Sequence, residues 1–114
     1  MRRPEAADRV TDRFDDEHAP IFSVGQVADL LGVQPAFVRR LDTETVVQPA
    51  RSAGGQRRYS QLQVRQVAQV RAMAAEGLNL AGIRRILVLE AEVDRLERRI
   101  ERLDPPARRR RAAP

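Results

Sequence analysis

Two pairs of neighbouring arginines are the side chains of this chain best suited to binding a polyanion. Arg39 and Arg40 lie in a stretch with helical spacing, and Arg57 and Arg58 follow a Gly-Gly pair in the sequence GGQRRYS. A guanidinium donates paired hydrogen bonds to phosphate oxygens or to the edge of a guanine. All 21 basic residues of the chain are arginine, a composition that a GC-rich genome also favours. The arginine pairs therefore indicate nucleic-acid binding only if the fold presents them together.

The sequence has few residues that could bind a metal or carry out catalysis. The chain has 114 residues, no Cys and a single histidine, His18, in a polar stretch. These facts exclude a thiolate metal site, a disulfide framework and a catalytic thiol. We find no cofactor motif and no clustered catalytic set, so we expect neither an enzyme nor a bound cofactor or metal.

The positive charge is unevenly distributed along the chain. Residues 21–89 hold nine arginines and four acidic residues, and the last ten residues hold four arginines and no acid. Residues 1–20 and 90–104 are each net negative. This asymmetry favours a nucleic-acid partner for residues 21–89 over a generally basic surface.

Local signals place the first arginine pair on the second of two short helices. Ser23 and Gln26 form a capping-box pattern for a helix over 24–31, which ends at Gly32. A second helix, over 35–44, begins at Pro35. One face of that helix carries Ala36, Arg39, Arg40 and Thr43 at helical spacing. A second helix after a short turn is where a recognition helix belongs, although such a stripe is also typical of an ordinary solvated face.

The second arginine pair is predicted to lie on a small hairpin. The β-branched run Thr45-Val46-Val47 predicts a short strand, and Arg57-Arg58-Tyr59 predicts its returning partner. Gly54-Gly55 supplies the reversal between them. A third helix should then begin after Ser60, with Val64, Val67, Val70 and Ala74 on its inner face, and end at Gly77.

The last predicted helix runs from Leu80, after the cap residue Asn79, to Leu103. Its apolar residues follow a heptad spacing at Ile86, Leu89, Val93, Leu96, Ile100 and Leu103. So narrow a stripe favours pairing with a second helix, and we assign these residues to dimerisation. The alternative is one amphipathic helix that folds back on its own domain. The sequence favours neither a parallel nor an antiparallel pair.

Together these elements predict a mainly α fold: a winged helix-turn-helix with a small β-hairpin wing, followed by a long C-terminal helix with a short heptad seam. We expect a disordered N-terminal arm over 1–20, a DNA-binding domain over 21–78, a dimerisation helix over 79–104 and a disordered basic tail over 105–114. No apolar run approaches the roughly 20 residues of a membrane helix, and the N-terminus has no secretory pattern, so we expect a cytoplasmic protein.

Three segments resemble the DNA-binding region of MerR-family transcriptional regulators. SVGQVADLLGVQPAFVRRLD is similar to the family's helix-turn-helix, and GGQRRYS to the end of its wing. EGLNLAGIRRILVLEAEV is most similar to the HspR-type branch of heat-shock repressors. The chain departs from the family pattern at Leu41, where an aromatic residue is usual, and at Thr45-Val46, where Gly-Leu is usual. The resemblance implies double-stranded DNA as the partner and a chaperone as a co-regulator.

The sequence thus favours a homodimeric, sequence-specific transcriptional regulator, a repressor in the simplest case, that binds an inverted repeat. The residues predicted to contact DNA are Ala36, Arg39, Arg40, Thr43, Arg57, Arg58 and Tyr59, with Arg57 and Arg58 holding phosphates. One alternative is an excisionase-like or architectural DNA-binding protein. The other is an adaptor whose coiled-coil segment is the working part.

Overall fold

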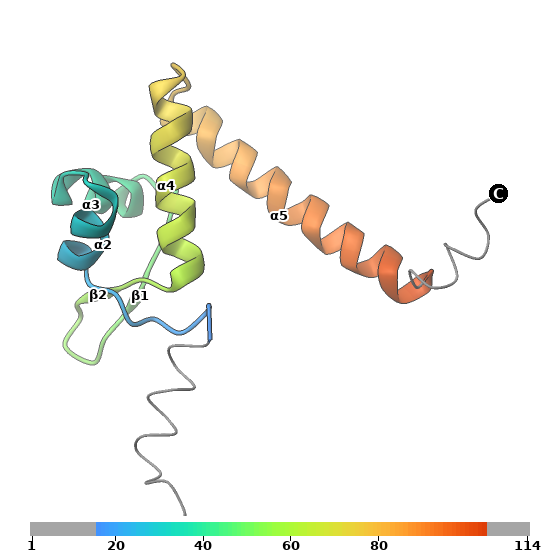
Figure 1. Ribbon diagram of the computed structural model, residues 1–114, viewed down its shortest axis with the longest axis horizontal. Helices are drawn as coiled ribbons and strands as arrows, with labels where there is room; N and C mark the ends of the chain where they lie inside the picture. The colour runs from blue at the N-terminus through green and yellow to red at the C-terminus, as the bar shows by residue number, and fades with distance from the viewer. Residues whose placement is uncertain (1–15, 105–114) are drawn as a thin grey trace, which may run out of the picture.

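The computed structural model describes residues 16–104, and the predictions made for 1–15 and 105–114 lie outside these residues. Within this range the elements are, in order, α2 (Val24–Leu31), α3 (Pro35–Thr43), β1 (Ala50–Arg51), β2 (Arg57–Arg58), α4 (Gln61–Ala75) and α5 (Leu80–Leu103). Figure 1 shows α2, α3, the hairpin and α4 gathered in one unit, with α5 running away from it. The predicted fold class, a winged helix-turn-helix followed by a long helix, is confirmed.

The helix-turn-helix is built by local capping. The Ser23 hydroxyl accepts a hydrogen bond from the Gln26 backbone N–H, and the Gln26 side chain accepts one from the Ser23 N–H, so the predicted capping box is present. α2 ends at Gly32, whose φ of 64° is the left-handed value that closes a helix. Pro35 then opens α3 at a position where its missing N–H costs nothing. The prediction for α2 is confirmed in full, and α3 is one residue shorter than predicted.

The strand predicted at Thr45-Val46-Val47 is wrong. These residues instead terminate α3. The Val46 N–H donates to the Leu41 carbonyl at 2.8 Å and the Thr45 N–H to the Asp42 carbonyl at 3.0 Å, the pattern of a Schellman motif. Val47 turns inward and is buried in the core. The β-branched composition of this run favours a strand, but the hydrogen bonds that close α3 and the burial of Val47 determine its conformation.

The wing is a two-stranded antiparallel hairpin in which Ala50 pairs with Arg58 and Arg51 with Arg57. Gly55, at φ 82°, provides the left-handed residue of the turn. Tyr59 leaves the hairpin and pairs with Phe22 instead. The Tyr59 N–H donates to the Phe22 carbonyl at 2.7 Å, and the Phe22 N–H donates back at 2.9 Å. The wing is therefore anchored to the segment that enters α2.

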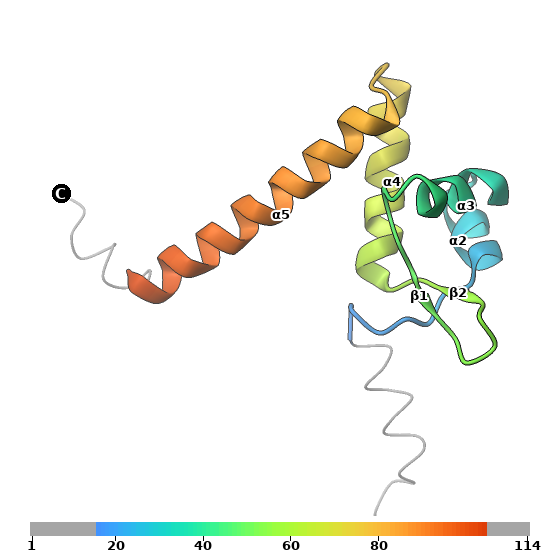
Figure 2. The same ribbon diagram turned by 180° about the vertical axis from the view of Figure 1, so that it is seen from behind.

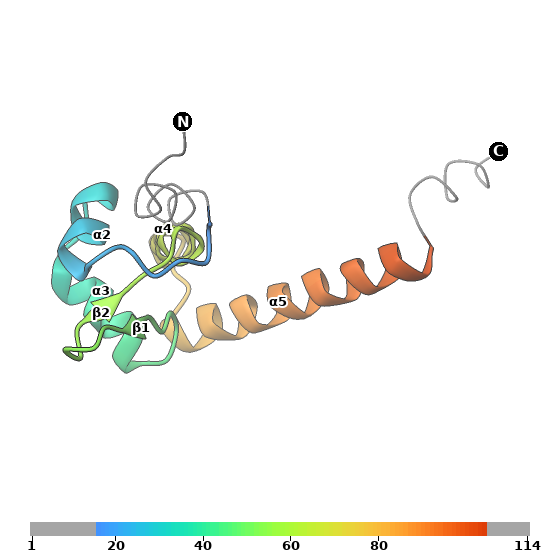
Figure 3. The same cartoon turned by 90° about the horizontal axis from the view of Figure 1, so that it is seen from below.

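The core is small and almost wholly aliphatic. It draws residues from every helix and from both ends of the wing: Val27, Ala28, Val38, Leu41, Val47, Tyr59, Val67, Val70 and Ile83. Figures 2 and 3 show α4 beside the helix-turn-helix, with the first turns of α5 close to the C-terminal end of α4. Ala74 was predicted to face this core, but it is exposed, because the C-terminal end of α4 extends beyond the core.

The described part of the N-terminal segment packs on the domain. Ala19 is buried, the Glu17 carbonyl accepts a hydrogen bond from the Leu62 N–H at 3.1 Å, and the Glu17 carboxylate pairs with Arg65 of α4. The predicted disordered arm over 1–20 is therefore wrong for residues 16–20. The acidic character of this stretch gave no sign that Ala19 is buried or that Glu17 pairs with Arg65 of α4.

α5 packs on the domain only through its first turns. Asn79 caps it, as predicted, by accepting from the Gly82 N–H at 2.8 Å. Ile83 is fully buried, but every residue from 88 to 103 is exposed, and Leu103 is 71% exposed. Figures 1 and 3 show the helix projecting into open space. The fold-back alternative is thus wrong, and the seam has no partner within residues 16–104. Over the same range, no helix is both long and apolar enough to cross a membrane.

Candidate nucleic-acid interface

The outer face of α3 presents the predicted stripe to solvent. All four of its residues, Ala36, Arg39, Arg40 and Thr43, are exposed. The Thr43 hydroxyl donates to the Arg39 carbonyl at 3.1 Å, and Arg40 Nε donates to Glu44 one turn later at 2.6 Å. An exposed ion pair of this kind is worth little, so a phosphate or a base can replace Glu44 as the partner of Arg40.

A single carboxylate joins α3 to the wing. Asp42 Oδ2 accepts from Arg57 Nε at 2.7 Å and from Arg51 Nη2 at 3.0 Å. The Asp42 side chain is only 13% exposed and that of Arg57 only 24%. Arg57, predicted to be a phosphate contact, therefore fixes the hairpin against α3 through at least one of its nitrogens. Sequence reasoning missed Asp42 because its partners lie nine and fifteen residues away.

The wing carries two further guanidinium groups. The Arg51 side chain is 51% exposed, and its Nη1 also donates to the Gly55 carbonyl at 3.3 Å. Arg58 Nη2 donates to the Gln56 side chain at 2.9 Å. Arg51 was not predicted, although a hairpin paired outward from Gly54 would have placed it opposite Arg57. The wing thus offers Arg51 and Arg58 in addition to the arginines of α3.

The prediction that Tyr59 contacts DNA is wrong for this fold. Its side chain is 0% exposed and lies in the core, beneath the wing. Burial, and to a lesser extent the nearby negative charge of Asp42, raises the pKa of the Tyr59 hydroxyl, while Arg57 and Arg51 oppose that rise. Within residues 16–104 the hydroxyl has no hydrogen-bond partner. Tyr59 is therefore a structural residue that anchors the end of the wing in the core.

The state of Tyr59 gives an expected dependence of stability on pH. Its pKa is raised on folding, so above about pH 10 the unfolded chain loses the phenolic proton more readily than the folded chain. The free energy of unfolding should then fall as pH rises. Urea unfolding at pH 7 and at pH 10.5 measures this change. Tyr59→Phe should remove the Tyr59 part of the decline, and should leave stability at pH 7 unchanged or raise it by about 1 kcal/mol, because the hydroxyl is unpaired. A clear loss of stability in Tyr59→Phe at pH 7 would contradict this assignment.

Removal of the Asp42 charge should loosen the wing. Asp42→Asn leaves two arginines side by side without their carboxylate, and we expect a loss of about 2 kcal/mol in unfolding free energy. That corresponds to a fall in Tm of roughly 8–16 °C for a domain of this size. Asp29→Asn, at an exposed carboxylate on α2, is the matched control and should melt like the parent. Equal melting temperatures for the two variants would show that Asp42 does not hold the wing.

The fold and this surface together define a class: a winged helix-turn-helix that presents an arginine-bearing second helix next to a basic hairpin. The chain matches the MerR HTH family regulatory protein model over residues 22–89 and belongs to that family. The resemblance seen in the sequence is thereby confirmed. The family consists of regulatory proteins and not of enzymes, in agreement with our expectation.

Similar proteins point the same way. The chain is 39% identical over 88 residues to a putative heat shock protein HspR of Streptomyces coelicolor, a match that covers 76% of this chain and 58% of that protein. It is 30% identical over 76 residues to the HTH-type transcriptional regulator GlnR of Bacillus anthracis, with 67% and 59% covered. The chain therefore spans less than two thirds of the length of these relatives.

One solved structure shares the fold. A MerR-family transcriptional regulator from Bacillus cereus superposes with a TM-score of 0.55 at 21% identity, covering 80% of this chain and 71% of that one. At this identity the likeness concerns the arrangement of the elements. It agrees with the winged helix-turn-helix followed by a long helix.

Proposed function

We propose that this protein is a sequence-specific regulator of transcription that binds double-stranded DNA as a homodimer. One observation carries the proposal: Asp42 holds the basic wing against α3, whose exposed face carries Arg39 and Arg40. A recognition helix of this kind enters the major groove, where Arg39 and Arg40 can reach base edges, while a flanking hairpin contacts phosphates. Membership of a family of regulatory proteins supports the same role.

The exposed seam of α5 supports the homodimer. Five of its six apolar residues are among the large hydrophobic side chains left in solvent, at Leu89, Val93, Leu96, Ile100 and Leu103. A stripe this narrow on a projecting helix fits a second copy of the same helix. In our proposal, residues 21–78 bind DNA and residues 79–104 join two chains, so that two copies of α3 meet the two halves of an inverted repeat.

Repression is the simplest regulatory output of such a molecule. Two wings and two recognition helices bound across a promoter exclude other proteins from the same stretch of DNA. The chaperone that the family resemblance implied as a co-regulator has no support among the described residues or in the names of the relatives, and it is not part of this proposal.

Selection from a random pool of DNA duplexes tests the proposal. The chain is mixed with the pool, bound duplexes are recovered, and the enriched sequences are read after several rounds. We expect an inverted repeat whose half-sites are about one helical turn apart. Enrichment of a single half-site would contradict the dimer, and a pool that stays random would contradict sequence-specific binding.

The wing arginines should contribute affinity without sequence preference. Loss of one phosphate contact reduces the slope of log K against log salt by roughly one. We therefore expect Arg51→Ala to reduce this slope by about one and to weaken binding to selected and random duplexes by similar factors. Both variants lose a contact with Asp42, and Arg57→Ala should lower the melting temperature more, because its pair with Asp42 is shorter and less exposed than that of Arg51. An unchanged salt slope in Arg51→Ala would show that Arg51 does not contact a phosphate.

A further inference from the structure

Three helices of this chain end in the same way, but one of them uses an unusual residue. At the end of α2, the Val33 N–H donates to the Ala28 carbonyl around Gly32, at φ 64°. At the end of α4, the Leu78 N–H donates to the Met73 carbonyl around Gly77, at φ 97°. The end of α3 has the same bonds around Thr45, at φ 57°. Among residues 16–104, Thr45 is the one residue other than glycine with a positive φ.

A β-branched residue is strained in the left-handed region, where glycine is not. Added Cβ atoms at Gly32 and Gly77 would meet nothing within 4 Å, so the positive φ and not lack of space accounts for glycine at those positions. The same motif at the end of α3 would close equally well with glycine. A strained residue at a helix end points to a role for its side chain, and Thr45 has a hydroxyl that glycine lacks.

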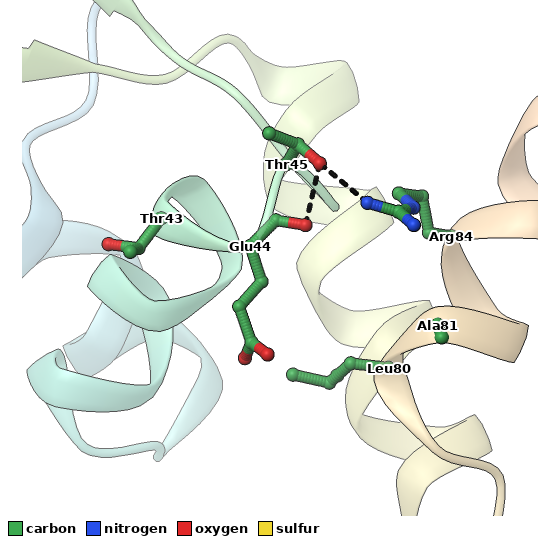
Figure 4. A pocket seen from close by; sticks show the side chains of 6 residues that line it. All are labelled: Thr43, Glu44, Thr45, Leu80, Ala81 and Arg84. Carbon is green, nitrogen blue, oxygen red and sulfur yellow. Dashed lines mark hydrogen bonds between the residues drawn. The ribbon is translucent and has the colours of Figure 1, made fainter.

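The hydroxyl of Thr45 links the end of the recognition helix to α5. It accepts a hydrogen bond from Arg84 Nη1 at 2.9 Å and donates one to the Glu44 carbonyl at 2.7 Å, as Figure 4 shows. Both hydrogen-bonding roles of the hydroxyl are thus filled. Arg84 lies one residue after Ile83, the buried anchor of α5.

Apolar packing leaves this boundary partly open. A pocket of about 270 Å³ separates the last turn of α3 from the first turn of α5, and its lining residues are Thr43, Glu44, Thr45, Leu80, Ala81 and Arg84. α5 is otherwise held by the packing of Ile83 in the core and by Gln69 of α4, whose Nε2 donates to the Glu90 carboxylate at 2.7 and 2.9 Å. The Thr45–Arg84 hydrogen bond spans the open side and connects α5 to the end of α3.

The direction of α5 matters because the helix is long. Its 24 residues extend about 36 Å, so a tilt of roughly 10° at the base moves the far end by about 6 Å. In a dimer joined along α5, that movement changes the separation and the relative rotation of the two recognition helices.

We infer that Thr45 and Arg84 are positioning residues that hold α5 at a fixed angle to the recognition helix and thereby set the half-site spacing that the dimer accepts. The inference about spacing rests on the proposed function. The angle itself is a property of the free protein and can be measured without DNA.

Distances between two spin labels measure the angle. The chain has no cysteine, so Asp29→Cys on α2 and Arg98→Cys on α5, both exposed, provide the only two thiols. Labelled chain is diluted with an excess of unlabelled chain so that distances are within one protomer. Thr45→Val keeps the branched shape and the backbone strain but removes the hydroxyl, Arg84→Met removes the donor, and Thr45→Ser keeps the hydroxyl.

We expect a narrow distance distribution in the parent and in Thr45→Ser, and a distribution broadened or displaced by several ångströms in Thr45→Val and Arg84→Met. Parent-like distributions in both of these variants would overturn the inference, because apolar packing alone would then fix α5. Equal broadening in Thr45→Ser and Thr45→Val would also overturn it, because the hydroxyl would then not be the cause.

A second measurement tests the consequence for DNA. The duplex selected by the parent is resynthesised with spacers one base pair longer and one shorter between the half-sites. The parent and Thr45→Ser should bind the original spacer tightest, and Thr45→Val and Arg84→Met should lose most of that preference. If these two variants keep the parent's preference, the link does not set spacing. If the parent selects no duplex, the proposed function fails, while the label distances still decide whether the link exists.

Discussion

Leu96→Asp is expected to convert a dimeric protein into a folded monomer. Leu96 lies in the middle of the seam on α5, far from the core residues of the winged domain. In a dimer the new carboxylate would be buried against the partner helix without a cation, which costs about 3–5 kcal/mol. Light scattering of the parent and the variant at micromolar concentration measures the change in mass. Circular dichroism should show that the winged domain is retained.

Ala91→Asp is the matched control for this prediction. Ala91 is exposed on the same helix, on the side opposite the seam, so the same charge there should leave the dimer intact. Either of two results would contradict the seam as the interface: a parent that is already monomeric, or a Leu96→Asp variant that keeps the mass of a dimer.

Arg39→Ala and Arg40→Ala should each weaken binding to the selected duplex by about 5- to 150-fold, the equivalent of 1–3 kcal/mol for a lost base contact. Binding to random duplexes should fall much less, since base contacts carry the sequence information. Fluorescence anisotropy with both duplexes measures the two effects. Arg98→Ala, at an exposed arginine on α5, is the control and should bind as the parent does. If both α3 variants bind the selected duplex like the parent, α3 is not the recognition helix.

The helices could be predicted from the sequence because their ends are encoded locally. The capping boxes at Ser23 and Ser60 and the cap at Asn79 each involve residues three positions apart, and all three are present. The periodicity of α3 likewise predicted which side chains would be exposed. Helix starts were therefore readable without a structure, but the end of α3 was not, because threonine, unlike glycine, does not indicate a positive φ.

Features decided by contacts between distant residues were not predictable in the same way. The run after α3 has the composition of a strand, but Val47 is buried in a core shared with residues of α2, α4 and α5. Tyr59 follows two arginines that suggest DNA contact, yet the fold places its side chain in the core. The pairing of Asp42 with Arg57, fifteen residues away, becomes visible only when the hairpin lies against α3.

In our proposal, two copies of this chain together bind a specific DNA sequence through α3 and the wing. A titration of the selected duplex and of a scrambled duplex of equal composition, at physiological salt, tests it most directly. We predict two chains bound per selected duplex, with an affinity at least about 1,000-fold higher than for the scrambled duplex. Equal affinity for the two duplexes, or one chain per selected duplex, would contradict the claim.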